Sequence, residues 1–244
     1  MTSKDKALIV APTYAIESYA NPAEMLLDAL APGESFSLSD LPRIKVPVGG
    51  GLAWELPGGE PAREFEAVIL HRQLSRAFWN DEFSGEGSPP DCRSDDNIHG
   101  VGLWGVKDGV VANGNPNALC KECPMAAWGS GKGNAQACRQ NTSLYLLFPD
   151  MVFPVVLNVP PSSFSACHDY IVRDLTAFGI DKLSLTTKFS MVTAKSKPGP
   201  DGQGGGISYS QIRCERGTQL TPDLYAKMKA YRDGILPAIT PVAG

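Results

Sequence analysis

The sequence predicts a mainly β fold with added helices. Polar and apolar residues alternate at 64–74, 183–194 and 207–213, which is the pattern of strands that bury one face. Segments with helical spacing are few and do not alternate regularly with the strands, which argues against a parallel α/β sheet. Because 43% of the 244 residues are hydrophobic, the chain can form a sizeable core.

The first 60 residues are expected to form an N-terminal arm with a short helix near 22–30. Within this arm, Pro42 and Pro47 bracket an extended segment, and the glycines at 49–51 permit a sharp bend. The strand that follows should span 64–74. One of its faces would carry Phe65, Ala67, Ile69 and His71, and the other Val68, Leu70 and Arg72.

The second half of the chain should supply two strand pairs and two helices. Residues 144–148 and 152–159 read as paired strands. A helix should begin after Ser163, whose hydroxyl would cap it, and should end at Gly179. Its buried face would carry Phe164, Cys167, Ile171, Leu175 and Phe178.

Residues 183–194 and 207–213 should then pair across the glycine-rich loop 197–206, and a last helix should run from 221 to near Gly234. A helix between strands, together with long loops, is typical of an OB-like Greek-key barrel. We therefore expect a barrel core at 61–91 and 140–220, an inserted metal-binding subdomain at 92–139, and a C-terminal helix and tail at 221–244.

Four cysteines in the glycine-rich stretch 92–139 predict a structural zinc site. Cys120 and Cys123 are separated by two residues and followed by proline, a spacing that lets two thiolates grip one tetrahedral ion. Cys92 and Cys138 would complete the set of four. A segment so poor in apolar periodicity is typical of a small module stapled by metal.

Alternatives to this ligand set remain open. His99 could replace Cys92, or the pair at 120 and 123 could be an idle or redox-active dithiol. Cys167 and Cys214 fall on a helix face and in a strand, where cysteine usually behaves as a small buried hydrophobe. Four thiolates leave no open coordination position for water, so we expect a structural ion and no enzymatic activity.

Other features exclude several classes of protein. The stretch 129–133 resembles a phosphate loop, but Gly133 replaces the residue that would bind magnesium, which excludes a P-loop nucleotide hydrolase. No apolar run is long enough to span a membrane, and no secretion signal accompanies the cysteines. We therefore expect a cytosolic protein.

Single-stranded DNA is the expected ligand, because several segments place aromatic residues beside positive charge. Such proteins bind the backbone through Lys and Arg and stack bases on exposed rings. The net charge of −4 requires this surface to be a local patch. The candidate contacts are Arg72, Arg76, Trp79, Trp128, Lys132, Arg139, Lys188, Tyr209 and Arg213.

Several motifs together resemble a family of bacteriophage and mobile-element proteins. They are Pro42-Arg-Ile-Lys-Val-Pro, the glycines before Trp54, Pro90-Asp-Cys92, Cys120-x-x-Cys123-Pro, Ala137-Cys138-Arg139 and Pro160-Pro-Ser-Ser163. The family is similar in plan to the T4-type helix-destabilising protein, a zinc-containing single-stranded DNA-binding protein with an OB-type core. Unlike that protein, this chain offers four cysteines rather than a set that includes histidine, and 237–244 are not acidic.

The resemblance implies stoichiometric coating of single strands during phage or mobile-element DNA replication or recombination, with zinc ordering a DNA-facing subdomain. It also implies self-association and contacts with replication or recombination proteins. A competing hypothesis is a zinc-stapled module that docks another protein and binds no nucleic acid, which the negative charge favours. A metal-dependent nuclease is disfavoured because the sequence shows no cluster of carboxylates and histidines.

Overall fold

The computed structural model confirms the mainly β class. It describes residues 13–18, 25, 28, 40–47, 50–81, 89–107, 110–111, 114–115, 117–132, 135–195, 206 and 208–239. The strands are β1 (Arg43–Ile44), β2 (Trp54–Glu55), β3 (Pro61–Ala62), β4 (Glu64–Phe78), β5 (Cys92–Ser94), β6 (Val101–Gly102), β7 (Val106–Lys107), β8 (Val110–Val111), β9 (Arg139–Leu147), β10 (Val155–Val159), β11 (Leu185–Lys195) and β12 (Ser208–Gln219).

The described helical elements are fewer than the strands, and most of them are short. Short 3-10 helices are η1 (Ala15–Ser18), η3 (Cys120–Glu122), η4 (Pro124–Ala126) and η5 (Pro161–Ser163). The mid-chain helix is composed of α2 (Phe164–Asp169), the π-helical η6 (Tyr170–Leu175) and the 3-10 turn η7 (Thr176–Phe178). The last helix is α3 (Pro222–Ile239). None of the helices in the described ranges has both the length and the apolar character needed to cross a bilayer.

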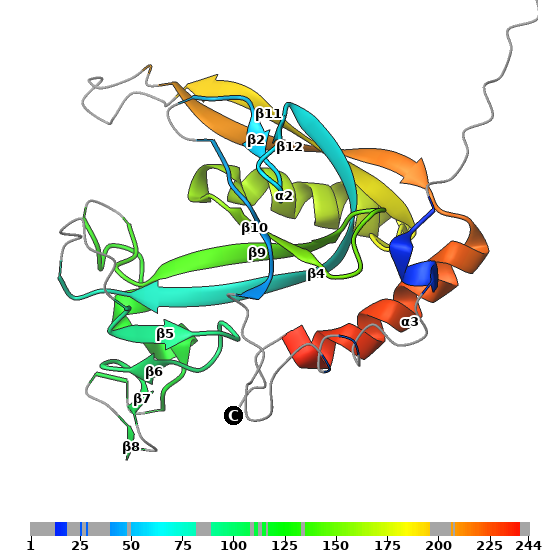
Figure 1. Cartoon of the computed structure of the whole chain (residues 1–244). Helices are drawn as coiled ribbons and strands as arrows, with labels where there is room; N and C mark the ends of the chain where they lie inside the picture. Colours follow the sequence, from blue (N-terminus) through cyan, green and yellow to red (C-terminus); the bar gives the residue numbers. More distant parts are fainter. Residues whose placement is uncertain are drawn as a thin grey trace, which may run out of the picture.

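The long strand β4 organises the sheet. Its first residues pair antiparallel with β11, its middle and end pair with β9, and its last three residues also pair with β5. The main sheet runs β1-β10-β9-β4-β5-β6-β7-β8, with the β11–β12 hairpin attached through β4. β4 bends strongly between the hairpin and β9 (Figure 1).

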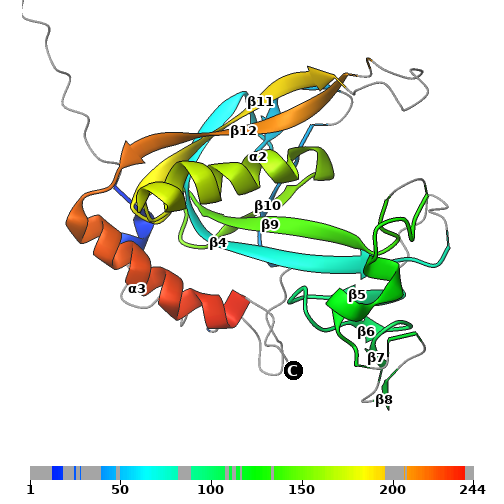
Figure 2. The same cartoon turned by 180° about the vertical axis from the view of Figure 1, so that it is seen from behind.

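The expected closed barrel is not seen among the described strands. β12 pairs only with β11, and the main path begins at β1 and ends at β8, so the ends of the sheet do not meet. The bend in β4 rolls the sheet around α2 instead, which leaves a half-open, mixed sheet with helices on both sides (Figures 1 and 2).

Each face of this sheet buries its own core. The inner face packs Phe65, Ala67 and Ile69 of β4 against Cys167 and Leu175 of the mid-chain helix. The outer face packs side chains of β4, β9 and β10 against α3 and η1. The buried members of this outer core are Tyr14, Ile16, Leu41, Val68, Leu70, Tyr145, Leu147, Val156, Leu183, Leu220, Leu224, Met228, Tyr231, Ile235 and Ile239. The predicted alternation along β4 is therefore confirmed as far as Leu70.

Beyond Leu70 the predicted faces of β4 are wrong. The register with β9 shifts between Ile69 and His71, so that Ile69 lies opposite Leu146 and His71 lies opposite Tyr145. The extra residue is a β-bulge, which turns the following side chains to the other face. His71 therefore joins the outer face, and Arg72 lies against the ring of Phe164 at 5.4 Å on the inner face.

The helix predicted after Ser163 is confirmed, but the Ser163 hydroxyl does not cap it, and its buried face departs from the expected one. Cys167 and Leu175 are buried, whereas Phe178 is 72% exposed. The π-helical turn of η6 holds more residues per turn than an α-helix, and it rotates the residues that follow. Tyr170 takes an interior position instead, where its hydroxyl bonds the Thr187 hydroxyl at 3.0 Å.

The Pro-Pro-Ser-Ser motif covers part of the β12 strand. The Ser163 hydroxyl accepts the amide hydrogen of Ile212 at 2.9 Å, and the Gln211 side chain donates to the carbonyl of Ser162 at 2.9 Å. An edge strand with unpaired amides is prone to pair with other chains. The motif thus protects one stretch of an edge strand and attaches the helix to the hairpin.

Some expected boundaries move, and others lie outside the described residues. β4 reaches Phe78 rather than 74, and α3 continues to Ile239 rather than ending near Gly234, with Pro237 inside its last turn. Of the helix expected at 22–30, only Met25 and Asp28 are described, and both are helical. The loop 197–206 lies outside the described residues except for its last glycine.

Candidate metal centre and nucleic-acid surface

The four candidate zinc ligands line one small cavity. Residues 92–139, here called the cysteine lobe, extend from the end of β4 and carry β5 to β8, η3 and η4 (Figure 1). Cys92, Cys120, Cys123 and Cys138 are all buried and all contribute to the cavity wall. The cavity holds about 10 Å³, which is room for one particle of about the size of a water molecule.

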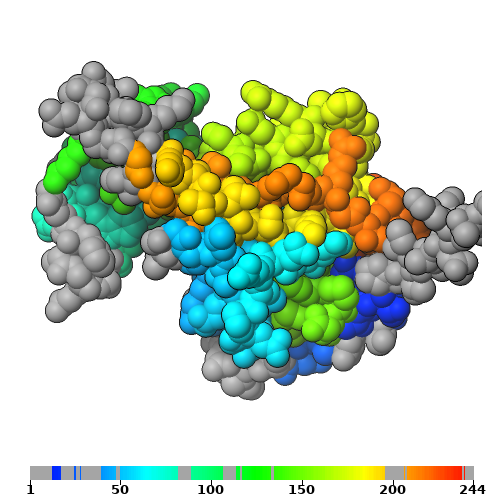
Figure 3. All heavy atoms as spheres, turned by 90° about the horizontal axis from the view of Figure 1, so that it is seen from above, coloured from blue at the N-terminus to red at the C-terminus, as the bar shows by residue number. Residues whose placement is uncertain are grey.

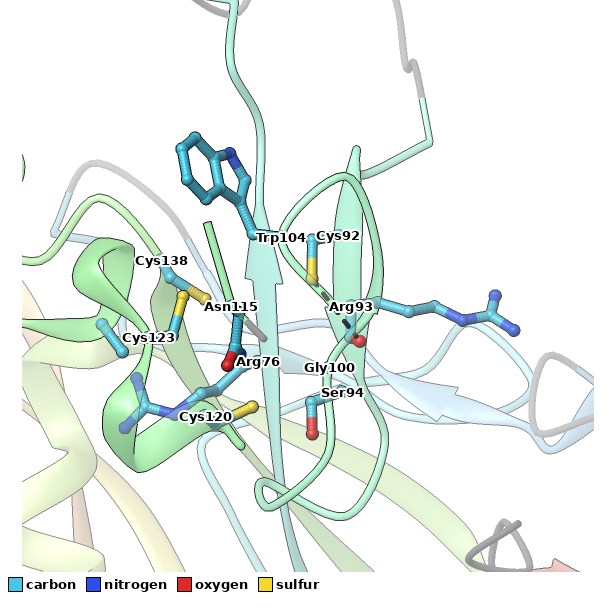
Figure 4. Close-up of a pocket in the computed structure, with 11 residues that line it drawn as sticks. Arg76, Cys92, Arg93, Ser94, Gly100, Trp104, Asn115, Cys120, Cys123 and Cys138 are labelled. Atoms are coloured by element: carbon cyan, nitrogen blue, oxygen red, sulfur yellow. Dashed lines mark hydrogen bonds between the residues drawn. The ribbon is translucent and has the colours of Figure 1, made fainter. Parts of the chain in front are cut away.

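Local backbone structure places each sulfur. The 3-10 turns η3 and η4 carry Cys120 and Cys123, and the Cys123 amide donates to the Cys120 carbonyl at 3.3 Å. The Cys138 amide donates to the Met125 carbonyl at 2.7 Å, which brings the start of β9 beside η4. In Figure 4 the sulfurs of Cys123 and Cys138 lie side by side, and the Cys92 sulfur lies across the cavity from them.

The position of Cys92 depends on a glycine in the neighbouring strand. It pairs with Gly102 of β6, whose φ is +128°. A Cβ atom added at Gly102 would stand 2.1 Å from the Asp91 carbonyl oxygen, so no other residue fits without moving the backbone. This close approach fixes Cys92 at the cavity wall.

The loop before the cysteine pair carries His99 but keeps it out of the cavity. Asp96 accepts the amides of Ile98 and His99 at 2.7 and 2.8 Å, and its second oxygen bonds the His99 ring at 2.8 Å. These bonds hold the pKa of the Asp96 carboxyl well below its usual range, although burial acts in the opposite direction. The structure therefore places Cys92, and not His99, with the other three sulfurs.

Burial raises the pKa of three of the thiols. The shift is upward for Cys92 and Cys120, and the pKa of Cys138 reaches about 11. Nearby Arg76 counteracts the rise at Cys120 and Cys138, and the neighbouring thiols add to it. A bound cation would reverse this balance, because zinc deprotonates the thiols that coordinate it.

The donor set fits a structural zinc ion. Four buried sulfurs around an ion-sized space match the tetrahedral thiolate sites that zinc prefers, with Zn–S distances of about 2.3 Å. In the described part of the chain, no three His, Cys, Asp or Glu side chains already stand in an arrangement that could hold an ion. The fit is therefore one of donor type and number, and not of coordination geometry.

Three unpaired polar atoms surround the same cavity. One guanidinium nitrogen of Arg76, the Trp104 indole nitrogen and the Asn115 side-chain oxygen are buried and form no hydrogen bond within the described structure. Arg76 is held by its Nε, which donates to Asn97 at 2.9 Å. Sequence reasoning missed Trp104 and Asn115, because neither residue type is a usual metal ligand and no spacing marks them as cavity residues.

The candidate DNA contacts fall into two groups. Arg76, Trp79, Trp128, Lys132 and Arg139 lie in or beside the cysteine lobe, whereas Lys188, Tyr209 and Arg213 lie on the β11–β12 hairpin. Figure 3 shows this hairpin along one face of the molecule, with part of the lobe at one end. Arg72 belongs to neither group, because it lies on the inner face beside α2.

The two groups differ in exposure and charge. Trp128 is 75% exposed and Trp79 is 42% exposed, although large aromatic rings are normally buried. Arg139 is exposed and forms no ion pair with a described residue. On the hairpin, by contrast, Lys188 pairs with Glu64 and Arg213 with Glu215, each at 2.8 Å. The lobe therefore combines the open ring of Trp128 with the charge of Arg139, which no ion pair with a described residue compensates.

The loop that resembles a phosphate loop is closed on itself. The amides of Gly129 and Gly131 both donate to the Ala135 carbonyl, at 3.0 and 2.9 Å, and the Ser130 hydroxyl donates to the carbonyls of Met125 and Ala127. Amides that are engaged within the loop cannot bind a phosphate. This geometry agrees with the sequence-based prediction that the loop is not a P-loop.

Comparison with protein-family models, with curated proteins and with solved structures gives no match for this chain.

Proposed function

We propose that this protein binds single-stranded DNA through the cysteine lobe, which a structural zinc ion orders. The observation that carries the proposal is the exposed ring of Trp128 on a lobe built around four buried cysteines. A ring with so few intramolecular contacts adds little to the stability of the fold, but it provides a surface on which a base can stack. Exposed aromatic rings beside basic side chains are the features by which proteins bind single strands without sequence preference.

Zinc would be held by Cys92, Cys120, Cys123 and Cys138. Its role there is to fix the fold of a lobe whose own apolar cluster is small. That cluster consists of Phe78, Cys92 and Cys138, with Trp104, Met125, Ala126 and Ala137 packed around it. Four thiolates and Zn²⁺ carry a net charge of −2, and Arg76 at the cavity wall offsets part of it.

The basic side chains of the lobe would contact the phosphates. Arg139 lies at the first position of β9, directly after Cys138, and the lobe also carries exposed Lys132 and Arg93. Arg93 lies 3.7 Å from Asp95, so its charge is partly compensated. Affinity that arises from such contacts is largely electrostatic and should fall steeply with salt.

The wider assignment is also part of this proposal. The half-open sheet, with β4 shared among three antiparallel pairings and a helix between β10 and β11, is compatible with an OB-like Greek-key core. We assign the protein to phage or mobile-element DNA replication or recombination in the bacterial cytoplasm. This assignment rests on the sequence resemblance described above.

A titration of the purified protein with a fluorescently labelled 20-mer of deoxythymidine tests the proposal. Anisotropy should rise to a saturable plateau at low salt, and the affinity should fall when the salt concentration is raised. A double-stranded competitor should displace the oligonucleotide less well than an unlabelled single strand. Absence of binding at low salt would overturn the proposal.

A protein-docking module is the second candidate, and one observation favours it. Ile98, Val101 and Leu103 are exposed apolar side chains around β6 of the lobe. Exposed apolar residues that lie together mark interaction surfaces more often than nucleic-acid contacts. Substitution of Val101 by Ser would disrupt docking to a protein but should leave oligonucleotide affinity within about twofold.

A further inference from the structure

A second cavity lies apart from the cysteine lobe, where the bulge of β4 meets the end of the mid-chain helix. Its volume is about 610 Å³, which is within the range of small-ligand sites, about 300–1,000 Å³. His71, Arg72, Ile171, Ile180, Asp181 and Lys182 contribute to its walls. The bulge places His71 on the outer face of β4 and Arg72 on the inner face, and both residues line the cavity.

Two cations at this cleft form no ion pair with a carboxylate of the described residues. Lys182 is half-buried and forms no hydrogen bond or ion pair with a described residue. Arg72 donates from Nη1 to the His168 ring at 3.1 Å and stacks on Phe164, while its Nε is buried without a partner. Holding such charges partly out of water costs free energy unless an anion compensates them.

The nearest acidic side chain, Asp181, opposes by its charge the lowering of the Lys182 pKa by burial, but it forms no ion pair with Lys182, and both of its oxygens already accept hydrogen bonds. One oxygen of Asp181 accepts the amide of Leu183 at 3.0 Å, and the other accepts the Tyr225 hydroxyl at 2.8 Å. Arg232 of α3 adds positive charge near His71 and Lys182, although it pairs with Asp233 at 2.7 Å. The excess of positive charge at the cleft contrasts with the net charge of −4 for the whole chain.

The walls between these charges are partly apolar. Ile171 and Ile180 line the cleft together with Thr176 and Gly179, and the space is several times larger than an inorganic phosphate requires. A ligand that combines a phosphate with a flat, less polar group would satisfy both parts of the site. Nucleotides have this composition.

We propose that this cleft binds the phosphate group of a nucleotide, with Lys182 and Arg72 as its cationic contacts and Ile171 and Ile180 against the sugar or base. The nucleotide can come from two sources, a free mononucleotide or a segment of a bound single strand. Only the second source rests on the proposed function.

The test uses the full chain and three variants of similar design. Lys182→Met and Arg72→Met each remove one cleft charge but keep an apolar side chain. Lys227→Met removes one charge from the exposed face of α3, where Lys227 pairs with Glu17 and Asp223, and serves as the control. Thermal melting of each variant establishes that it is folded before binding is measured.

Calorimetric titration with thymidine monophosphate and with inorganic phosphate forms one arm, and anisotropy with the labelled 20-mer at several salt concentrations forms the other. If the source is a free nucleotide, thymidine monophosphate binds the wild type more tightly than phosphate does. Lys182→Met and Arg72→Met should each then weaken it about tenfold, and Lys227→Met should not.

If the source is a bound strand, the two cleft variants lower the affinity for the 20-mer and reduce the salt slope by about 1 each. The proposal is overturned if both cleft variants match the control in both arms. If the wild type binds the monophosphate but no oligonucleotide, the proposed function is overturned and the cleft proposal is not. If both cleft variants bind the strand with an unaltered salt slope and the wild type does not bind the monophosphate, only the cleft proposal is overturned.

Discussion

Replacing Trp128 with alanine tests whether the cysteine lobe stacks on nucleobases. The ring is 75% exposed, so its removal should change the free energy of unfolding by less than about 0.5 kcal/mol. Stacking of one base on an aromatic ring is worth about 1–3 kcal/mol. The dissociation constant for single-stranded DNA should therefore rise by about 5- to 150-fold.

Phe178 provides the matched control for this substitution. It is a comparably exposed aromatic residue, at 72%, but it lies at the end of the mid-chain helix with the Arg216 guanidinium over its ring at 5.3 Å. Phe178→Ala should leave the affinity within about twofold. Anisotropy of a labelled 20-mer, measured for both variants at one salt concentration, makes the comparison.

The result that would refute the reasoning is an equal effect of the two substitutions. If Trp128→Ala binds as tightly as Phe178→Ala, the exposed ring of the lobe does not contact bases. If both variants lose affinity, the strand passes over the helical side of the molecule as well, and the lobe is not the distinctive surface.

Three further predictions concern the lobe and the bulge. Cys120→Ser should abolish zinc retention after dialysis and loosen the lobe. Cys167→Ser, which alters a buried thiol of the mid-chain helix, should keep one zinc per chain. Equal metal content in the two variants would contradict the ligand assignment. Gly102→Ala should destabilise the protein by about 1–3 kcal/mol, because its φ is +128° and the added Cβ meets the Asp91 carbonyl; a denaturant midpoint equal to that of the wild type would show that the turn is not constrained. Burial, with Lys182 and Arg232 nearby, lowers the pKa of His71, so the His71 ring binds a proton more readily in the unfolded chain than in the folded one. The contribution of neutral His71 to stability is therefore fully present above a pH of about 6.5 and is lost as the pH falls below it. His71→Gln should therefore reduce the fall in melting temperature between pH 7 and pH 5.5, and an unchanged fall would refute the assignment.

The central strands β4, β9 and β10 were predictable from sequence because each has one face toward each core. Along β4 the alternation of Phe65, Ala67 and Ile69 with Val68 and Leu70 determines which residues face which core. The bulge at Leu70 was not predictable, because it depends on the register with β9, a strand about 70 residues away in the sequence. The cleft, which is lined by the two residues after the bulge, could therefore not be predicted from the sequence.

The mid-chain helix shows the same limit on a smaller scale. Its closing Gly179 was correctly identified and has the left-handed φ of +69° expected at a helix end. The capping role of Ser163 was not, because its hydroxyl bonds the Ile212 amide of β12. The side chains after Tyr170 were assigned by a period of 3.6 residues. The π-helical turn changes that period, which is why Phe178 points to solvent rather than into the core.

The candidate zinc ligands were found by residue type and spacing, and the structure gathers all four around one cavity. Short spacings of this kind are visible in sequence because Cys120 and Cys123 share one turn. The partners Trp104 and Asn115 were not visible, because loop conformation alone brings them to the cavity. The assignment of the DNA contacts stays a prediction.

Metal analysis of the purified full chain tests the central claim most directly. The account predicts about one zinc per chain that survives dialysis and is released by a strong chelator, with a loss of ordered structure in the lobe. A chain purified without chelator that contains no zinc, and that takes up none when zinc is added, would contradict it.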